Sequence, residues 1–267
     1  MKKLIFLILL FLFSSLYSQD KLILTSKEIP YADTSLVFLP SGYDGTTAYP
    51  LLFMLHGWSG NYNQWNEVTE GLQYYADKYN FIIVCPDGFY ESWYIDSPVK
   101  PNSQFETFFL SSLLPRVFSQ YKIDMDNIFI TGLSMGGHGA ITLLLKHPDI
   151  FKSAASTSGI LDITAFPGSW NMQTVLGQFS AVPGNWEKNS AIFLLDKIKG
   201  MDKQILFDCG TEDFAYNVNR SFYEKCLTLK LKATFISQPG THSRIYWKNS
   251  IDTHFRFFSR LLSKNRS

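Results

Sequence analysis

Short apolar runs alternate with helix-like segments along most of this chain, and this alternation restricts the folds that it can adopt. The runs are rich in branched and aromatic residues and end in Gly or Pro: "SLVFLP", "YPLLFMLHG", "FIIVCPDG", "NIFITG", "KSAASTSG", "KQILFDCG" and "KATFISQPG". Continuous apolar runs of this length are typical of strands buried on both faces. Strands that alternate with helices predict right-handed βαβ units and a mostly parallel central sheet flanked by helices.

Residues 160–200 interrupt this rhythm, because the segment is too long and too mixed for one connection. We expect an insertion over the edge of the sheet that forms part of a pocket wall. No internal repeat or low-complexity linker divides the remainder, so residues 19–267 are expected to form one domain. A hydrophobic content of 46% is sufficient for a core of that size.

The N-terminus reads as a secretory signal peptide over residues 1–18. A short basic start, "MKK", precedes the apolar "LIFLILLFLF" and small polar residues. A membrane span needs about 20 apolar residues, and this run is half as long. We expect a secreted or periplasmic protein with no stable membrane span after cleavage. The formal charge of +1 gives no reason to expect a nucleic acid partner or an anionic membrane surface.

Three cysteines, Cys85, Cys209 and Cys226, are too few for a disulfide-stapled fold. Their spacing fits no CxxC metal pair, so no metal site is expected. We expect mostly buried apolar side chains. A single Cys209–Cys226 disulfide, which would leave Cys85 free, stays open as an alternative.

One serine stands between glycines directly after an apolar run. The segment Gly132-Leu133-Ser134-Met135-Gly136 fits G-x-S-x-G and lies between strand-like "NIFI" and helix-like "HGAITLLL". A nucleophile elbow needs this context, because its serine occupies the tip of a strained strand-to-helix turn. The helix N-terminus behind it favours developing negative charge. Ser134 is therefore the expected nucleophile. Without G-K-[ST] or G-x-G-x-x-G here, a phosphate-binding loop is excluded.

Of the five histidines, His242 is the expected general base. It lies in "SQPGTHSRIYW", after an expected strand and before the final helix. A loop at that place brings an imidazole over the carboxyl edge of the sheet. The other four have less suitable positions, and we expect the last of them to be structural or on the surface: His56, His138, His147 and His254.

An acid must hold the tautomer of the base, and "FDCGTEDF" offers three carboxylates. Asp208 falls within the expected strand, whereas Glu212 and Asp213 lie in the loop beyond it. The order Ser…Asp…His is that of α/β-hydrolases. Asp213 is the expected acid, Glu212 is its nearest rival, and Asp162 is a distant one.

Two backbone N–H groups are expected to form an oxyanion hole. One belongs to Met135, the residue after the nucleophile, and the other to Trp58 in the loop after an earlier strand, "LLFMLHGWSG". Donors aimed at the developing oxyanion are worth about 10²–10³ in rate each.

Together these motifs resemble the putative-esterase family of α/β-hydrolases. The resemblance rests on "LHGWSGN", "VCPDGFYESWY", "TGLSMGGHGA", "HPDIFKSAASTSG", "CGTEDF" and "PGTHSRIYW", which follow the family's order through nearly the whole mature chain. Relatives include esterase D (S-formylglutathione hydrolase), feruloyl and acetylxylan esterases, short-chain tributyrin-type esterases and antigen 85 mycolyltransferases.

The resemblance implies an α/β-hydrolase fold, a Ser134–His242–Asp213 triad, and oxyanion donors at Trp58 and Met135. It also implies no metal or organic cofactor. Two departures stand out: Trp58 replaces a frequent leucine, and Ser243 and Arg244 follow the histidine where the family often has an acidic residue and tryptophan. The signal peptide argues against the cytosolic formylglutathione role.

The expected function is that of a secreted serine esterase acting through an acyl-enzyme. Two alternatives remain: an acyltransferase of the same fold, and a non-catalytic carbohydrate-binding relative. Flat rings beside polar groups suit sugars or aromatic acyl groups, which favours short acyl or feruloyl esters of carbohydrates. Some tryptophans are expected near the cleft, although at least two should pack the insertion onto the sheet: Trp58, Trp93, Trp170 and Trp186.

Overall fold

The computed structural model describes residues 19–263. The expected signal peptide, residues 1–18, lies outside the described residues, as do residues 264–267. In the described part, no helix has the length and apolar character needed to cross a membrane.

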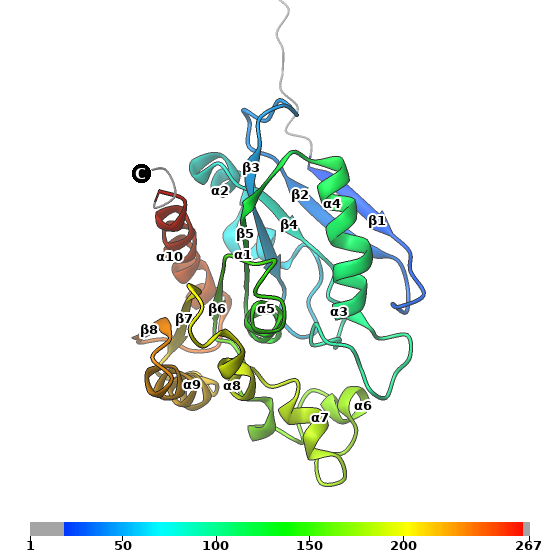
Figure 1. The fold of residues 1–267 in the computed structure, drawn as a ribbon, viewed down its shortest axis with the longest axis vertical. Coiled ribbons are helices and arrows are strands. Elements are labelled where there is room, and N and C mark those ends of the chain that lie inside the picture. Colours follow the sequence, from blue (N-terminus) through cyan, green and yellow to red (C-terminus); the bar gives the residue numbers. More distant parts are fainter. Residues whose placement is uncertain (1–18, 264–267) are drawn as a thin grey trace, which may run out of the picture.

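An eight-stranded sheet forms the centre of the fold, in the order β1-β2-β4-β3-β5-β6-β7-β8 (Figure 1). β2 pairs antiparallel with both of its neighbours, whereas the pairings from β4 through β8 are parallel. The strands are β1 (Asp20–Leu24), β2 (Asp33–Phe38), β3 (Tyr49–Leu55), β4 (Ile82–Cys85), β5 (Ile123–Gly132), β6 (Ser153–Thr157), β7 (Gln204–Gly210) and β8 (Lys232–Gln238). The expected mostly parallel sheet is confirmed.

Helices cover both faces of this sheet (Figure 1). Alternate residues of β3 belong to different cores, because successive strand side chains point to opposite faces. One core packs under α1 (Gln64–Thr69), α2 (Leu72–Tyr79) and α10 (Arg244–Ser263). The other packs under α5 (Met135–Lys146), α9 (Tyr216–Thr228) and a continuous run of α3 (Phe105–Phe108), the π-turn η1 (Phe109–Leu113) and α4 (Leu114–Gln120).

The expected insertion forms a cluster of short helices at the end of the molecule to which the parallel strands point (Figure 1). It contains η2 (Ile163–Ala165), α6 (Met172–Leu176), α7 (Pro183–Glu187), α8 (Ala191–Leu194) and η3 (Leu195–Ile198). Trp186 anchors it: the ring is fully buried and its Nε1–H donates to the Gly177 carbonyl at 2.9 Å. The insertion therefore lies beside the loops in which a site was expected.

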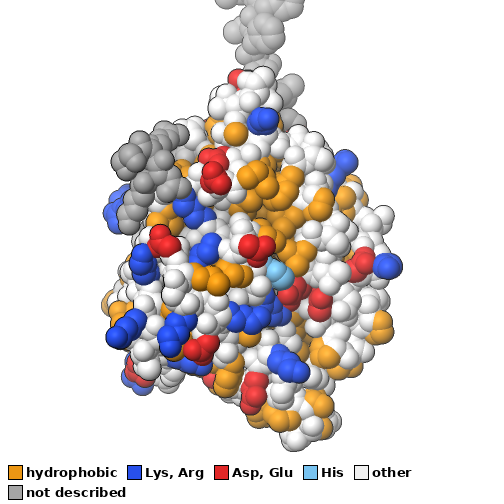
Figure 2. All heavy atoms as spheres, in the orientation of Figure 1, with side chains coloured by type: hydrophobic (Ala, Val, Ile, Leu, Met, Phe, Trp, Pro, Cys, Tyr) orange, Lys and Arg blue, Asp and Glu red, His pale blue; other side chains and the backbone are white. Residues whose placement is uncertain are grey.

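The three cysteines are free thiols with buried side chains. The expectation of buried apolar cysteines is confirmed, and the alternative Cys209–Cys226 disulfide is not formed. Within the described residues, no group of three or more His, Cys, Asp or Glu side chains is placed to hold a metal ion. Figure 2 shows acidic and basic side chains interspersed over one face, in keeping with the small net charge.

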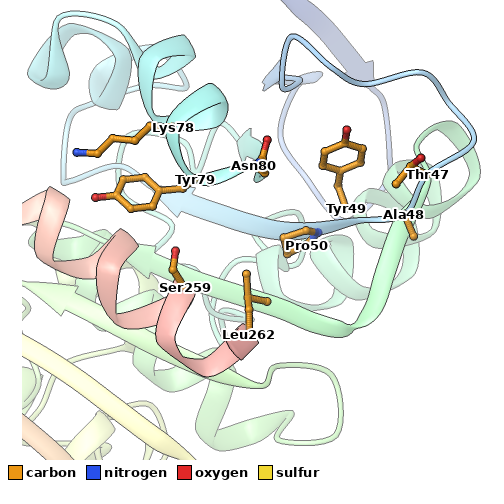
Figure 3. Close-up of a pocket in the computed structure, with 9 residues that line it drawn as sticks. All are labelled: Thr47, Ala48, Tyr49, Pro50, Lys78, Tyr79, Asn80, Ser259 and Leu262. Atoms are coloured by element: carbon orange, nitrogen blue, oxygen red, sulfur yellow. The ribbon is translucent and has the colours of Figure 1, made fainter. Parts of the chain in front are cut away.

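A hollow of about 540 Å³ lies beside the start of β3, between this strand and the helices α2 and α10 (Figure 3). Its walls include Tyr49 and Pro50 at the start of β3, with Lys78, Tyr79 and Leu262 from two helices. Ligand sites in open parallel sheets form at the carboxyl ends of strands. This hollow lies at the amino end of β3, the opposite end of the strand from the one where such sites form.

Candidate active site

Ser134 lies on a strained turn between β5 and α5. Its backbone has φ 53° and ψ −117°, a conformation that residues other than glycine rarely adopt. Two glycines permit this turn. A Cβ on Gly136 would lie 2.2 Å from the Leu55 carbonyl oxygen, and one on Gly132 would lie 2.2 Å from the Gly136 backbone. The G-x-S-x-G glycines are thus required by close backbone contacts, and the turn places Ser134 at the carboxyl edge of the sheet.

His242 links Ser134 to Asp213. Its Nε2 lies 3.0 Å from the Ser134 Oγ, and its Nδ1 lies 2.9 Å from Asp213 Oδ2 and 3.0 Å from Oδ1. Asp213 follows β7 and His242 follows β8, so the three side chains come from three separate strand ends. With Nδ1 protonated toward the carboxylate, Nε2 is free to accept the serine proton. The structure brings together the three residues that the sequence predicted.

The environment of Asp213 keeps its carboxylate ionised. Burial opposes ionisation, but hydrogen bonding and charge from His242, together with the Ala215 backbone N–H at 2.8 Å, outweigh it and lower the pKa of Asp213. Its two rivals lie elsewhere. Glu212 is exposed and faces the Thr211 hydroxyl, whereas Asp162 accepts hydrogen bonds from the N–H and hydroxyl of Thr164.

The remaining histidines have structural partners. His56 joins two strand-end loops, because its Nε2 accepts the Gly88 N–H and its Nδ1–H donates to the Gly57 carbonyl. His138 is buried in α5, where its Nε2 faces the Asn189 carbonyl at 2.7 Å. His147 pairs with Glu106. His254 was expected to be structural or on the surface; its full burial in α10 excludes the surface position.

The loop after β3 lies against the serine turn. Leu55 at the end of β3 is paired with Gly132 at the end of β5, and a Cβ on Gly57 would lie 3.4 Å from the Ser134 Cβ. From β3, the next strands in the chain are added on opposite sides of the sheet: β4 on one side and β5 on the other. Ligands bind at such a switch point in open parallel sheets. Within residues 19–263, neither the Trp58 N–H nor the Met135 N–H, the two predicted oxyanion donors, donates a hydrogen bond to another backbone group.

Aromatic rings surround the His242 side of the site. Phe214, which is 49% exposed, lies with its ring centroid 4.4 Å from that of His242. Trp170 and Phe166 from the insertion contact Phe214 in turn, at 5.7 and 6.0 Å between centroids. The insertion thus contributes to the wall of the site, as expected. Sequence reasoning missed Phe214, although its position directly after Asp213 was an available signal.

The other tryptophans divide between site and core. Trp58 is half-buried and packs against Tyr90 at 4.9 Å between centroids. Trp93 was one of the tryptophans considered for the cleft, but only 1% of it is exposed. Its backbone has a positive φ of 55°, and its ring lies beside His138 and Trp170.

A second hollow, of about 390 Å³, begins at the Tyr90 ring that contacts Trp58. Tyr31 and Tyr90 are each about half exposed, and Phe89 packs edge-on against Tyr31. Polar groups from Lys100 and Asn102 lie among these rings. We refer to this hollow as the Tyr90 groove.

The match to a known family decides the class of this chain. A family model described as "Putative esterase" matches residues 26–258, nearly all of the described fold. The chain belongs to the putative esterase family. Membership makes it a carboxylic ester hydrolase, in line with the serine, histidine and acid that the fold brings together.

Members with curated names resemble the chain over most of its length. An acetyl esterase of Caldicellulosiruptor saccharolyticus is 26% identical over 79% of this chain and 83% of its own. An S-formylglutathione hydrolase of Bos taurus is 24% identical over 85% of this chain and 88% of its own. The solved structure of a ferulic acid esterase, at 25% identity, superposes with a TM-score of 0.78 over 91% of this chain and 97% of its own. These similarities confirm the α/β-hydrolase fold expected from the sequence.

Proposed function

We propose that this esterase hydrolyses its substrates through an acyl-enzyme on Ser134, with His242 as general base and Asp213 as its supporting acid. The contact that carries the proposal is the 3.0 Å distance between the Ser134 Oγ and His242 Nε2. A nucleophile and base in direct hydrogen-bond reach, with the base oriented by a third group, is the arrangement that activates a serine.

In the first half-reaction, His242 Nε2 accepts the hydroxyl proton as the Ser134 Oγ attacks the ester carbonyl. The carbonyl oxygen becomes an oxyanion held by the N–H groups of Trp58 and Met135. His242 then gives its Nε2 proton to the alcohol oxygen, and the alcohol leaves. In the second half-reaction, a water molecule gives a proton to His242 and attacks the acyl carbon. Ser134 regains its proton, the carboxylic acid leaves, and Asp213 stays ionised throughout.

We further propose short acyl or feruloyl esters of carbohydrates as the substrates. Phe214, Trp170 and Phe166 offer flat rings beside His242, where the leaving alcohol receives its proton. The Tyr90 groove adds exposed rings among polar groups on the Trp58 side. Rings combined with a few polar groups are suited to stacking sugars or aromatic acyl groups. Relatives named acetyl esterase and ferulic acid esterase are consistent with this class.

Export through the signal peptide at residues 1–18 is part of the same proposal. An exported esterase meets polymers and scavenged esters rather than cytosolic thioesters. N-terminal sequencing of the protein made by its own host tests this point. A mature chain that begins near residue 19 supports export, and an intact Met1 in the purified protein contradicts it.

The catalytic assignment is tested with a fluorophosphonate probe and p-nitrophenyl acetate. Wild-type protein should be labelled and active, and Ser134→Ala should be neither, because only the nucleophilic oxygen is lost. In a well-studied protease, removal of the nucleophile cost about 10⁶ in kcat. Residual activity above a few per cent in folded Ser134→Ala would reject Ser134 as the nucleophile.

The substrate class is tested by specificity constants. Acetylated and feruloylated xylo-oligosaccharides are compared with p-nitrophenyl acetate and butyrate. Higher kcat/KM for one of the sugar esters supports the proposal. Equal or lower values for every sugar ester reject it and leave a general short-chain esterase.

A further inference from the structure

A second hydroxyl–imidazole–carboxylate chain lies in the core beneath the candidate triad. The Thr131 Oγ1 lies 2.8 Å from His254 Nδ1, and His254 Nε2 lies 2.6 Å from Asp208 Oδ2. None of the three is more than 1% exposed. Such burial denies substrate any access, so this chain of contacts is no second active site.

Two further hydroxyl groups complete the network. The Thr157 hydroxyl donates to Asp208 Oδ1 at 2.7 Å, and the Ser250 hydroxyl lies 3.1 Å from the Thr157 Oγ1. Both oxygens of the buried carboxylate and both nitrogens of the buried imidazole therefore have partners. We call these five residues the buried clamp: Thr131, Thr157, Asp208, Ser250 and His254.

Each of the three central clamp residues lies in a strand or helix next to the loop that carries a triad residue. Thr131 precedes Ser134 by three residues at the end of β5, and Asp208 precedes Asp213 by five at the end of β7. His254 lies twelve residues after His242, in α10, the helix that follows the His242 loop. The clamp thus joins β5, β7 and α10, the elements next to the triad loops, through side chains that are buried below the triad.

Backbone contacts carry this connection up to the site. The Thr157 carbonyl accepts the Ser134 N–H at 3.0 Å, and the Asp208 carbonyl accepts the Ser158 N–H at 2.8 Å. The carbonyl of Thr157 therefore holds the serine turn, and the carbonyl of Asp208 holds the end of β6 beside it. If the side-chain hydrogen bonds of Thr157 or Asp208 change, these backbone contacts should shift with them.

Stability alone is a poor explanation for such a network. Removing charged and polar groups from water is costly, and apolar side chains of similar volume are often as stabilising as a buried ionic pair or more so. Directional hydrogen bonds also fix the relative position of the segments that they join. A triad whose residues come from three segments requires such fixed positions, because a displacement of 1 Å between reacting groups can lower the rate about 100-fold.

We propose that the buried clamp positions the candidate triad, so that its members are positioning residues for the esterase reaction. This inference rests on the proposed catalytic role of Ser134, His242 and Asp213. The clamp sets the Ser134–His242 and His242–Asp213 distances by holding β5, β7 and α10 in register.

The decisive variant is Thr131→Val, which keeps the shape of the side chain and removes its hydrogen bond to His254. We expect kcat for p-nitrophenyl acetate to fall at least about 10-fold, and about 100-fold if the displacement nears 1 Å. KM should stay within about twofold, because the substrate contacts are untouched. Thr131→Ser, which restores the hydroxyl, should recover most of the lost activity.

A matched control separates this role from ordinary packing. Thr142 in α5 is also about 1% exposed, but its hydroxyl donates to the His138 carbonyl of its own helix and lies outside the clamp. Thr142→Val therefore makes the same chemical change at similar burial. If both valine variants show the same kcat per folded molecule, the clamp is merely structural and the proposal is wrong.

A readout independent of turnover keeps the proposal separate from the catalytic assignment. The proton between His242 Nδ1 and Asp213 gives a downfield proton NMR resonance, which should shift or broaden in Thr131→Val and remain in place in Thr142→Val. Failure of Ser134→Ala to abolish activity would overturn the proposed function, but this resonance would still report on the clamp. Should Thr131→Val not fold, Asp208→Asn, which keeps the carboxylate's shape, is judged by the same criteria, and an unshifted resonance with unchanged kcat overturns the proposal.

Discussion

The ring of Phe214 lies against the imidazole of His242, with 4.4 Å between the centroids and 35° between the planes. Phe214 directly follows Asp213, so one short loop supplies both the carboxylate that faces His242 Nδ1 and the ring that covers its face. The imidazole is thereby held at its edge and on one face. Trp247 also contacts this imidazole, with 5.1 Å between the centroids and 90° between the planes.

Phe214→Ala should loosen His242 and remove part of the apolar wall. We expect kcat for p-nitrophenyl acetate to fall about 10-fold. If the ring stacks on the substrate as proposed, KM for feruloyl esters should rise more than KM for acetyl esters. Steady-state kinetics on both ester types provides the measurement. Phe214→Tyr keeps the ring and serves as the control. Unchanged kinetics in Phe214→Ala would show that the ring has no part in the site.

Asp213→Asn and Glu212→Gln separate the two acidic candidates. Asparagine cannot stabilise the imidazolium and favours the wrong tautomer of His242, so kcat should fall by about 10⁴, as in the analogous protease substitution. Glu212 is exposed, and its replacement should change kcat less than twofold. The pair is compared in one assay. A crippled Glu212→Gln beside an active Asp213→Asn would reverse the assignment.

Gly136→Ala should disrupt the serine turn. The added Cβ would meet the Leu55 and His56 carbonyl oxygens at 2.2 and 2.5 Å, and backbone atoms cannot yield as a flexible side chain can. We expect a loss of about 1–3 kcal/mol or more in stability, together with loss of activity as Ser134 and Met135 shift. Denaturant unfolding and kcat measure the two effects. At Gly168 an added Cβ meets nothing within 4 Å, so Gly168→Ala should leave both unchanged.

His138 predicts a specific pH dependence of stability. Burial lowers the pKa of His138 from its ordinary 6.5 to about 4. Because the folded value lies below the unfolded one, the unfolded chain binds the extra proton between pH 6.5 and 4. Folding stability therefore falls as the pH falls through that window, on the order of 3 kcal/mol at most.

His138→Leu removes this titration and should flatten the decline. The free energy of unfolding is measured for wild type and variant at pH 7 and at about pH 4.5. Relative to wild type, the free energy of unfolding of the variant should be more favourable at about pH 4.5 than at pH 7. The same difference at both pH values would mean that His138 does not titrate in this way.

The sequence predicted the central sheet and the triad because both depend on local patterns. Apolar runs specify buried strands, and the serine turn is specified by glycines within two residues of Ser134. Asp213 and His242 could be found because both follow strands, and the carboxyl ends of parallel strands meet at one edge. The edge strands were less readable. β8 was expected to be buried on both faces. It lies at the edge of the sheet, and all of its residues are exposed or half-buried.

The sequence could not predict contacts that depend on how distant helices and strands pack against one another. Asp208 reads as a strand residue and His254 as a helix residue, and both readings are correct. Their 2.6 Å contact depends on how α10 packs across β7, which no local pattern encodes. Trp93 is a similar case: its position after a strand-end loop allowed a place at the cleft, but its ring is buried in the core.

The position of the clamp along the chain also has a consequence for folding. Ser134 and its base are 108 residues apart in the sequence, and His254 belongs to the final helix. Because the chain leaves the ribosome N-terminus first and a domain generally folds as a unit, the site cannot assemble until α10 has left the ribosome and docked. Recovery of esterase activity during refolding should therefore coincide with the last folding phase, later than the first burial of the tryptophans.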